Sequence, residues 1–304
     1  MNSPLHSAMK VGIVQFMAYP EAQRPDGPVL ETITRIAEDP FFAAIEITSI
    51  PDAGVRAQVA RLLAASHLVV GYGAQPIQLG GKLDLNSRDR EHRQKAVERL
   101  KAAVDEAYEL GAQRFAVLSG PFPGAEHEAE AVKLLVDSLN ELCAYASSKG
   151  AMGVCLETFD RSIDKKSLIG PNALAVEVSA AVRRENPTFG LMLDLSHLPL
   201  QFETSEQALN VAKDHLVHAH IGNCVLNDKG NPLYGDLHPR FGVEGGENDV
   251  PEVVEYLSVL RDIGYIGDGK QNVVAFEVKP AGGESSAVVI ANAKRTLLEA
   301  WARL

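Results

Sequence analysis

The sequence predicts a single (β/α)8 barrel, and three observations lead to this fold. Eight short apolar runs alternate with helical patterns along the 304 residues. No serine- and glycine-rich linker divides the chain, so one domain is expected over residues 1–304. The alternative, a doubly wound open sheet, usually has a glycine-rich loop after its first strand. The corresponding segment here, "FMAYPEAQRPDGP", contains no such loop.

The predicted strands are short runs of valine, isoleucine, leucine and phenylalanine between polar loops. Such runs are typical of strands that are buried on both faces of a parallel sheet. The runs cover residues 10–16, 42–48, 67–73, 114–120, 152–158, 190–196, 216–222 and 273–279.

The clearest predicted helix covers residues 89–111. Its apolar side chains recur every three or four residues, which places them on one face, and Gly111 provides a stop. A second helix is expected over residues 128–150, and Asp249 followed by Pro251 marks the start of another. The apolar face of the first helix consists of Val97, Leu100, Val104 and Tyr108.

The two ends of the chain differ in pattern. Residues 285–304 predict a closing helix, whereas residues 1–9 are expected to form a flexible extension. This first segment lacks the long apolar core of a signal peptide, and no run approaches the roughly 18 apolar residues that a membrane span needs.

Composition limits the classes of partner. Hydrophobic residues make up 46% of the chain and charged residues 23%, as in an ordinary globular protein. The net charge of -11 argues against nucleic acid or an anionic membrane as a partner, because binding either one needs a cationic surface on the protein. A bound cation is compatible with this charge. Three cysteines make a disulfide framework unexpected and favour a reducing cytoplasm. Whether the chain forms a homo-oligomer is left open by the sequence.

Polar residues interrupt four consecutive apolar runs near their ends. They are Glu157, Asp194, His220 and Glu277. Each alone could be a cap or a hydrogen-bonded core group, but chemistry in a barrel is located at the carboxyl ends of the strands. Clustering the acids there without a counterion is strongly unfavourable. Three carboxylates and one imidazole suit Mn²⁺, Mg²⁺ or Co²⁺ and are less typical of structural zinc.

At these positions the sequence resembles the xylose-isomerase-like barrels of the sugar isomerase and epimerase group, which includes ketose 3-epimerases and hydroxypyruvate isomerases. The resemblance covers essentially the whole chain. It is most specific in "LETFDR" (156–161), "DLSH" (194–197), "HAHIGN" (218–223), "FGVEGGEND" (241–249) and "FEVKP" (276–280).

The resemblance implies one divalent ion held by Glu157, Asp194, His220 and Glu277. Mn²⁺ is expected, with Mg²⁺, Co²⁺ and Zn²⁺ as alternatives. It also implies that Glu157 and Glu277 act as acid and base on either side of a small sugar or sugar derivative. The implied enzyme is a cytoplasmic isomerase or epimerase that moves a proton beside a carbonyl through an enediolate.

Two other activities occur on similar sites. A lyase or hydratase would use the same metal and base to eliminate from a keto-sugar, and this alternative stays open. Abasic-site endonucleases share the barrel but use a histidine-rich multinuclear zinc site and a cationic face. An acidic chain with one clear metal-binding histidine fits them poorly.

Four further residues are expected to bind substrate. His197 is expected to contact a substrate oxygen, and His218 either orients a ligand or is structural. Glu46, the lone charge in "FAAIEIT", either hydrogen-bonds inside the pocket or pairs with a structural arginine. Many ketose epimerases carry an arginine about six residues beyond the metal-binding histidine, where this chain has Leu226. Arg240 is expected to replace it.

Arg240 belongs to a long polar segment, residues 227–249, which also contains Asp236 and His238. Loops after barrel strands carry specificity, so this segment is expected to reach over the site. The alternative is an ordinary surface loop. Lys165, in the loop after the fifth strand, is either an anion contact or solvated.

Overall fold

Eight parallel strands form one sheet in the order β1-β8-β7-β6-β5-β4-β3-β2. The computed structural model describes residues 4–304. The strands are β1 Lys10–Ile13, β2 Ala44–Ile47, β3 Val69–Gly73, β4 Arg114–Val117, β5 Gly153–Glu157, β6 Gly190–Asp194, β7 Leu216–Gly222 and β8 Val273–Glu277.

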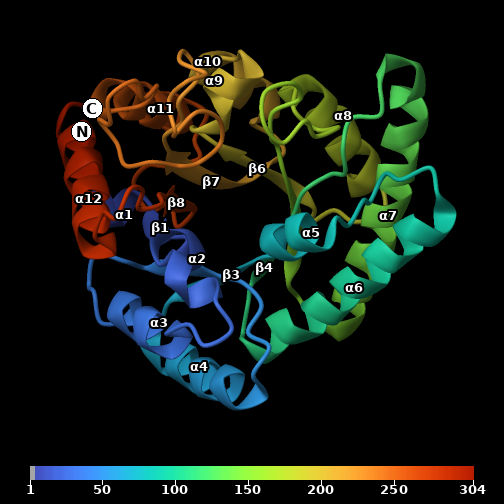
Figure 1. Cartoon of the computed structure of the whole chain (residues 1–304), viewed down its shortest axis with the longest axis horizontal. Coiled ribbons are helices and arrows are strands. Elements are labelled where there is room, and N and C mark those ends of the chain that lie inside the picture. Colours follow the sequence, from blue (N-terminus) through green and yellow to red (C-terminus); the bar gives the residue numbers. More distant parts are fainter. Residues whose placement is uncertain (1–3) are drawn as a thin grey trace.

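The sheet closes between its first two strands. The backbone N–H of Ala43 donates to the carbonyl of Val11 at 2.8 Å, and Val14 forms a parallel bridge with Glu46. Helices surround the strands on the outside, as Figure 1 shows. The predicted single (β/α)8 barrel is therefore confirmed.

The helices connect successive strands and pack against the outside of the barrel. Two short 3-10 helices, η1 Pro20–Gln23 and η2 Ala125–His127, lie in the connections. The α-helices are α1 Leu5–Ala8, α2 Gln15–Ala18, α3 Val29–Ala37, α4 Ala53–Ser66, α5 Gln75–Gly81, α6 Arg90–Glu109, α7 Glu128–Lys149, α8 Asn172–Arg183, α9 His197–Gln201, α10 Ser205–Ala212, α11 Val250–Asp262 and α12 Ser286–Ala302.

Local sequence signals explain where the main helices begin and end. The carboxylate of Asp89 accepts the first free N–H groups of α6, and Gly111 follows that helix with a φ of 76°, which glycine adopts without strain. Asp249 and Glu252 form a capping box at the start of α11. The predicted boundaries of these helices hold to within about two residues, and Tyr108 is only half-buried.

Two predictions at the element level are wrong. The strands are shorter than their apolar runs: β1 ends at Ile13, and the chain turns into α2, where Phe16 is buried without belonging to a strand. The flexible extension does not hold for residues 4–9, because Leu5 and Met9 pack into the core. Residues 1–3 lie outside the described residues.

Small residues inside the barrel leave room for charged ones. Gly71 on β3 faces Glu46 on β2, and a Cβ at Gly71 would lie 2.8 Å from Cγ of Glu46. An alanine there would push the glutamate out of place.

Among the described residues, no helix is long and apolar enough to cross a bilayer.

Candidate metal and active site

The four strand-end residues converge at the carboxyl mouth of the barrel. Glu157 ends β5, Asp194 ends β6, His220 lies near the end of β7 and Glu277 ends β8. Their ligand atoms all lie within 4.8 Å of one another. Nδ1 of His220 is 2.8 Å from Glu277 Oε2, 3.6 Å from Glu157 Oε1 and 3.7 Å from Asp194 Oδ2. The predicted convergence is observed.

The polar atoms that face this centre need a partner. Glu157 Oε1, Asp194 Oδ2 and His220 Nδ1 are buried and have no hydrogen-bond partner among the described residues. Nδ1 of His220 is close to Glu277 but lacks the geometry of a hydrogen bond. Leaving such groups buried and unsatisfied is costly. A divalent cation would satisfy all of them at once, so the donor set fits a metal ion; that the four residues hold one stays a prediction.

Crowding of the carboxylates affects the pKa of Asp194. Burial raises the pKa of Asp194, and the neighbouring charge of Glu277 raises it further, against the opposing effect of His197. The backbone N–H of Ser196 donates to Asp194 Oδ1 at 2.6 Å, which fixes the carboxylate and leaves Oδ2 facing the centre. A bound cation would favour the charged form of this acid.

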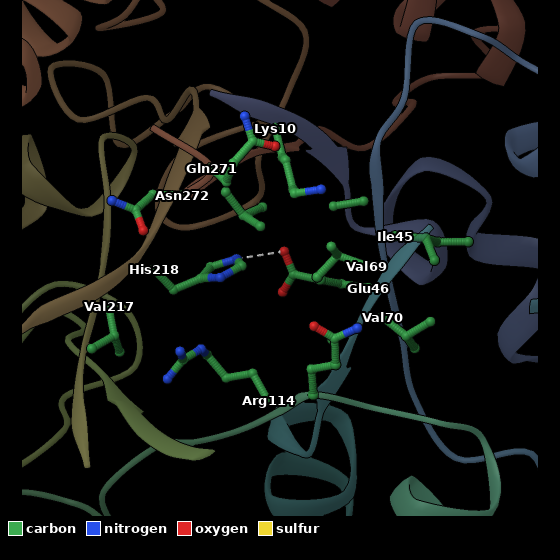
Figure 2. A pocket seen from close by; sticks show the side chains of 14 residues that line it. Lys10, Ile45, Glu46, Val69, Val70, Arg114, Val217, His218, Gln271 and Asn272 are labelled. Carbon is green, nitrogen blue, oxygen red and sulfur yellow. Dashed lines mark hydrogen bonds and ion pairs between the residues drawn. The ribbon is translucent and has the colours of Figure 1, made fainter. Parts of the chain in front are cut away.

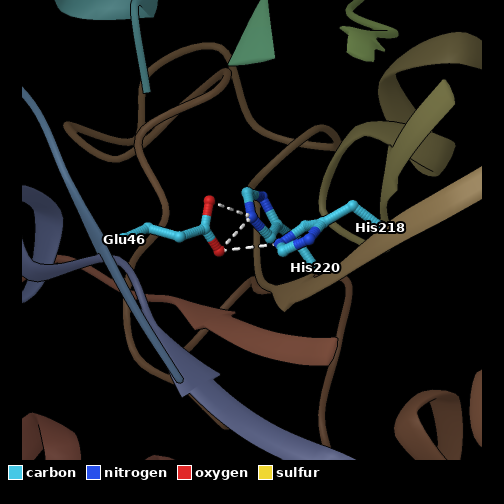
Figure 3. A group of neighbouring side chains, drawn as sticks. All are labelled: Glu46, His218 and His220. Carbon is cyan, nitrogen blue, oxygen red and sulfur yellow. Dashed lines mark hydrogen bonds and ion pairs between the residues drawn. The ribbon is translucent and has the colours of Figure 1, made fainter. Parts of the chain in front are cut away.

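Behind the centre, one carboxylate joins the two histidines of β7. Nε2 of His218 donates to Glu46 Oε1 at 2.8 Å (Figure 2), and Nε2 of His220 donates to the same oxygen at 2.9 Å (Figure 3). Burial acts to raise the pKa of Glu46, but the two histidines outweigh it and hold the pKa below its usual value. Burial acts to lower the pKa of His220, but Glu46 and the other carboxylates raise it well above the usual value.

These contacts place His218 outside the pocket over the strand-end cluster. Its ring faces Glu46, on the side of the barrel interior away from the carboxyl mouth, and does not line the pocket over the strand-end cluster. Glu46 does line that pocket, and its partners are these two histidines rather than an arginine. Of the two alternatives for Glu46, the structure has the hydrogen bond and not the arginine pair. That Glu46 contacts substrate stays a prediction.

A second polar group lies beside the first and comes from the long segment after β7. Asp236 Oδ1 is 2.8 Å from Nε2 of His238 and 3.2 Å from Nε2 of His197. Its other oxygen is 2.9 Å from Nζ of Lys165. Asp194, His197 and His238 also place ligand atoms within 4.8 Å of one another. One metal-binding histidine was expected from the sequence, whereas the structure brings two more, His197 and His238, beside the carboxylates.

The charges of this group are mutually stabilised. Burial acts to lower the pKa of His197, but the charge and hydrogen bond of Asp236 raise it to about 10. Burial also acts to lower the pKa of His238, but Glu277 and Asp236 raise it to about 9. Burial acts to raise the pKa of Asp236, and the two histidines bring it well below its usual value.

Two expected substrate contacts are placed differently. His197 is fully buried: Nδ1 donates to the carbonyl of Thr158 at 2.8 Å, and Nε2 faces Asp236 instead of an open pocket. Nε of Arg240 donates to Glu284 at 2.8 Å, and Arg240 does not line the pocket. The segment 227–249 does reach the site, as predicted, but through Asp236 and His238. These two residues, two positions apart in "DLH", were the signal in the sequence that had been given no role.

A pocket of about 350 Å³ lies over the cluster. Glu157 and Glu277 both face it, and the side-chain amide of Gln75 donates to Glu157 Oε2 at 2.6 Å. Two lysines line it, Lys165 and Lys279. Lys165 is already paired with two aspartates, whereas Lys279 has no ion pair within residues 4–304. The apolar part of the wall consists of Val14, Phe16, Met17, Pro76, Leu79, Phe159 and Leu237.

Comparison with known proteins agrees with this architecture. A protein-family model described as "xylose isomerase-like TIM barrel" matches residues 35–293. No curated protein sequence matches the chain.

Solved structures with the same fold align over nearly the whole chain. A D-tagatose 3-epimerase-like protein is 17% identical, with 97% of this chain and 99% of the other covered and a TM-score of 0.70. The IolI protein with a bound zinc atom is 18% identical, with the same coverage and a TM-score of 0.74. The 3-keto-D-glucoside 4-epimerase YcjR from E. coli is 19% identical, with 95% and 98% covered and a TM-score of 0.65. At these identities the likeness shows the fold.

Proposed function

Because the chain belongs to the xylose isomerase-like TIM barrel family, we propose that it is a divalent-metal-dependent isomerase or epimerase of a small sugar or sugar derivative. One observation carries the proposal. Three carboxylates and an imidazole place their ligand atoms within 4.8 Å of one another at the mouth where barrel enzymes carry out their chemistry. The ketose epimerases among the similar folds support the choice of substrate class.

Glu157 and Glu277 are the proposed proton-transfer pair. They come from β5 and β8 and both face the pocket. One carboxylate removes the proton from the carbon beside the substrate carbonyl, and the other, once protonated, returns a proton to the neighbouring position or to the opposite face. Gln75 fixes Glu157 by donating to Oε2, which leaves Oε1 free to face the centre.

The remaining side chains hold the substrate and its charge. A divalent ion in the cluster would supply Lewis-acid stabilisation of the negative charge that develops on the substrate oxygens. Lys279 offers a positive charge at the pocket wall, and the aromatic and aliphatic side chains exclude water from the reacting carbon.

Mn²⁺ is the proposed ion, and the cytoplasm is the proposed location of the protein. Oxygen-rich ligands favour Mn²⁺, with Mg²⁺, Co²⁺ and Zn²⁺ as alternatives. The three cysteines are buried and free, which is compatible with the expected cytoplasmic location. No nucleic acid is proposed as a partner, because the chain carries a net charge of -11.

The test uses ketoses, the class of sugar named for the similar L-ribulose 3-epimerase and D-psicose 3-epimerase. The purified protein is incubated with each ketose and Mn²⁺ in heavy water, and the products are followed by NMR and mass spectrometry. An isomerase or epimerase gives a product of unchanged formula with deuterium at the carbon beside the carbonyl. Loss of water or cleavage of a bond to an aglycone would favour a lyase or hydratase instead. A protein without activity on any keto-sugar or aldose would contradict the proposal.

A further inference from the structure

A second cavity opens at the amino-terminal mouth of the barrel, at the opposite end from the metal cluster. Its volume is about 240 Å³, and its walls are the first residues of the strands, including Lys10 on β1, Ala44 on β2, Val69 on β3 and Arg114 on β4. The hydrogen-bonded pair of Glu46 and His218 forms its inner end, as Figure 2 shows.

Two cations line this cavity from different strands. Figure 2 shows Lys10 and Arg114 on either side of the Glu46–His218 pair. Neither forms an ion pair with any residue of the described range 4–304, and Nη1 of Arg114 is buried without a hydrogen-bond partner there. The chain makes room for this guanidinium. A Cβ at Gly153 on β5 would lie 3.1 Å from Nη1, so a larger residue would crowd it.

One acid, Glu46, lies in the same lining as the two cations. Glu46 accepts hydrogen bonds from both His218 and His220 and is therefore already engaged. The two cations outnumber this one acid, so the lining has an excess of positive charge in a protein with a net charge of -11. The side chain of Gln113 adds polar atoms to the lining, whereas the amide of Asn272 already donates to Tyr265.

We propose that this cavity binds an oxyanion with two negative charges, either inorganic phosphate or the phosphate group of a small metabolite. Two cations on facing walls can each give a charge-assisted hydrogen bond to a phosphate oxygen. The volume lies just below the range of about 300–1,000 Å³ for pockets of drug-sized ligands, so a compact anion fits better than a large one. This inference does not depend on the proposed enzyme activity.

Isothermal titration calorimetry of the full-length protein with inorganic phosphate at constant ionic strength tests the proposal. The wild-type protein and the control Arg61→Gln, which removes an exposed cation on α4, are expected to bind phosphate saturably with the same Kd. Lys10→Gln and Arg114→Gln are each expected to raise the Kd by about tenfold or more, because each removes a charge-assisted hydrogen bond.

Circular dichroism checks that each variant is folded, and Lys10→Gln decides alone if Arg114→Gln does not fold. Titration with glycerol 3-phosphate distinguishes the two sources. Tighter binding than phosphate indicates a metabolite, and weaker binding indicates the inorganic ion. Phosphate bound at the metal cluster would have the same Kd in all variants. That result, or no saturable binding to the wild type, overturns the proposal.

Discussion

Glu46 on β2 and His220 on β7 come from strands that are not neighbours in the barrel, and their side chains meet at 2.9 Å. The contact occupies Nε2 of His220, so the ring presents Nδ1 to the three strand-end carboxylates. A carboxylate behind a histidine ligand fixes the tautomer and the orientation of the ring. We therefore expect Glu46 to position His220 without touching the ion itself.

Glu46→Gln is expected to weaken metal binding by about tenfold or more, since loss of such a supporting carboxylate typically costs 10–100-fold in affinity. Competition with a fluorescent chelator measures the dissociation constant of Mn²⁺. Glu109→Gln, which changes an exposed glutamate paired with Arg56, serves as the control and should bind metal as the wild type does. Equal affinities in the two variants would show that the contact does not support the metal site.

Asp194→Asn is expected to remove most of the bound metal. Asp194 is fully buried, and its Oδ2 faces the other three groups without a hydrogen-bond partner in the described chain. An amide presents either a neutral oxygen or an N–H to the ion and so loses the charge attraction. Elemental analysis of the purified protein gives the metal content per chain, with Asp214→Asn, an exposed aspartate, as the matched control. A variant at position 194 that keeps full occupancy would contradict the assignment.

The strand-end residues could be predicted from the sequence because a barrel imposes a regular geometry. An acid at the end of one apolar run and an acid or histidine at the end of the next must lie at the same mouth, so Glu157 and Glu277 could be placed without a structure. The orientation of His218 was not accessible in the same way. The alternation of side chains along β7 puts His218 on the same face as His220. Its partner, Glu46, comes from β2, a strand that is not a neighbour of β7, so the contact is visible only in the folded barrel.

Loop residues were harder to predict for a physical reason. A long segment can turn any of its polar side chains toward the site, and sequence alone does not say which one. Arg240 was chosen for its charge, yet Glu284, in the loop before α12, provides it with an ion pair away from the pocket. The buried cluster with His197 depends on Asp236. The path of segment 227–249 sets the position of Asp236 relative to α9, where His197 lies.

Lys279 and Arg240 form a natural comparison, since one cation lines the pocket and the other does not. Lys279→Met is expected to raise the KM for an active ketose by about tenfold, because loss of one charge-assisted hydrogen bond is worth roughly 1.5–3 kcal/mol. Arg240→Ala should change the KM by less than about twofold. Steady-state kinetics and metal content are measured on the same preparations. The reverse order of effects would restore Arg240 as the substrate contact.

The stability of the metal-free protein is expected to fall as the pH rises above neutrality. The pKa values of His197 and His238 are raised from 6.5 to about 10 and about 9. A raised pKa means that the folded state binds protons more tightly than the unfolded state. The stabilisation is therefore fully present below about pH 6.5 and is lost as the pH rises through about 9 to 10.

Thermal unfolding between pH 6 and pH 10 measures this dependence, and each kcal/mol lost lowers the Tm by roughly 2 °C in a chain of this length. His238→Gln should unfold at a lower temperature at pH 7 and show a flatter decline toward pH 10. His127→Gln, at a partly exposed histidine, should follow the wild type. A Tm of the wild type that stays constant or rises over this range would contradict the proposed charge state of the cluster.

Replacing either glutamate of the proposed acid–base pair separates catalysis from metal binding. Glu157→Gln and Glu277→Gln keep the shape of the side chain and an oxygen for the ion but cannot exchange a proton. Turnover is expected to fall by at least about 10²-fold, the typical contribution of one general base. Deuterium incorporation beside the carbonyl should fall with it, since both report the same proton transfer. Metal content measured on the same samples distinguishes this loss from a simple loss of the ion.

If both variants retain metal and exchange the proton at the wild-type rate, the base is another group. His238 would then be the first to examine, because it lines the pocket and its Nε2 lies 3.6 Å from Glu277 Oε1.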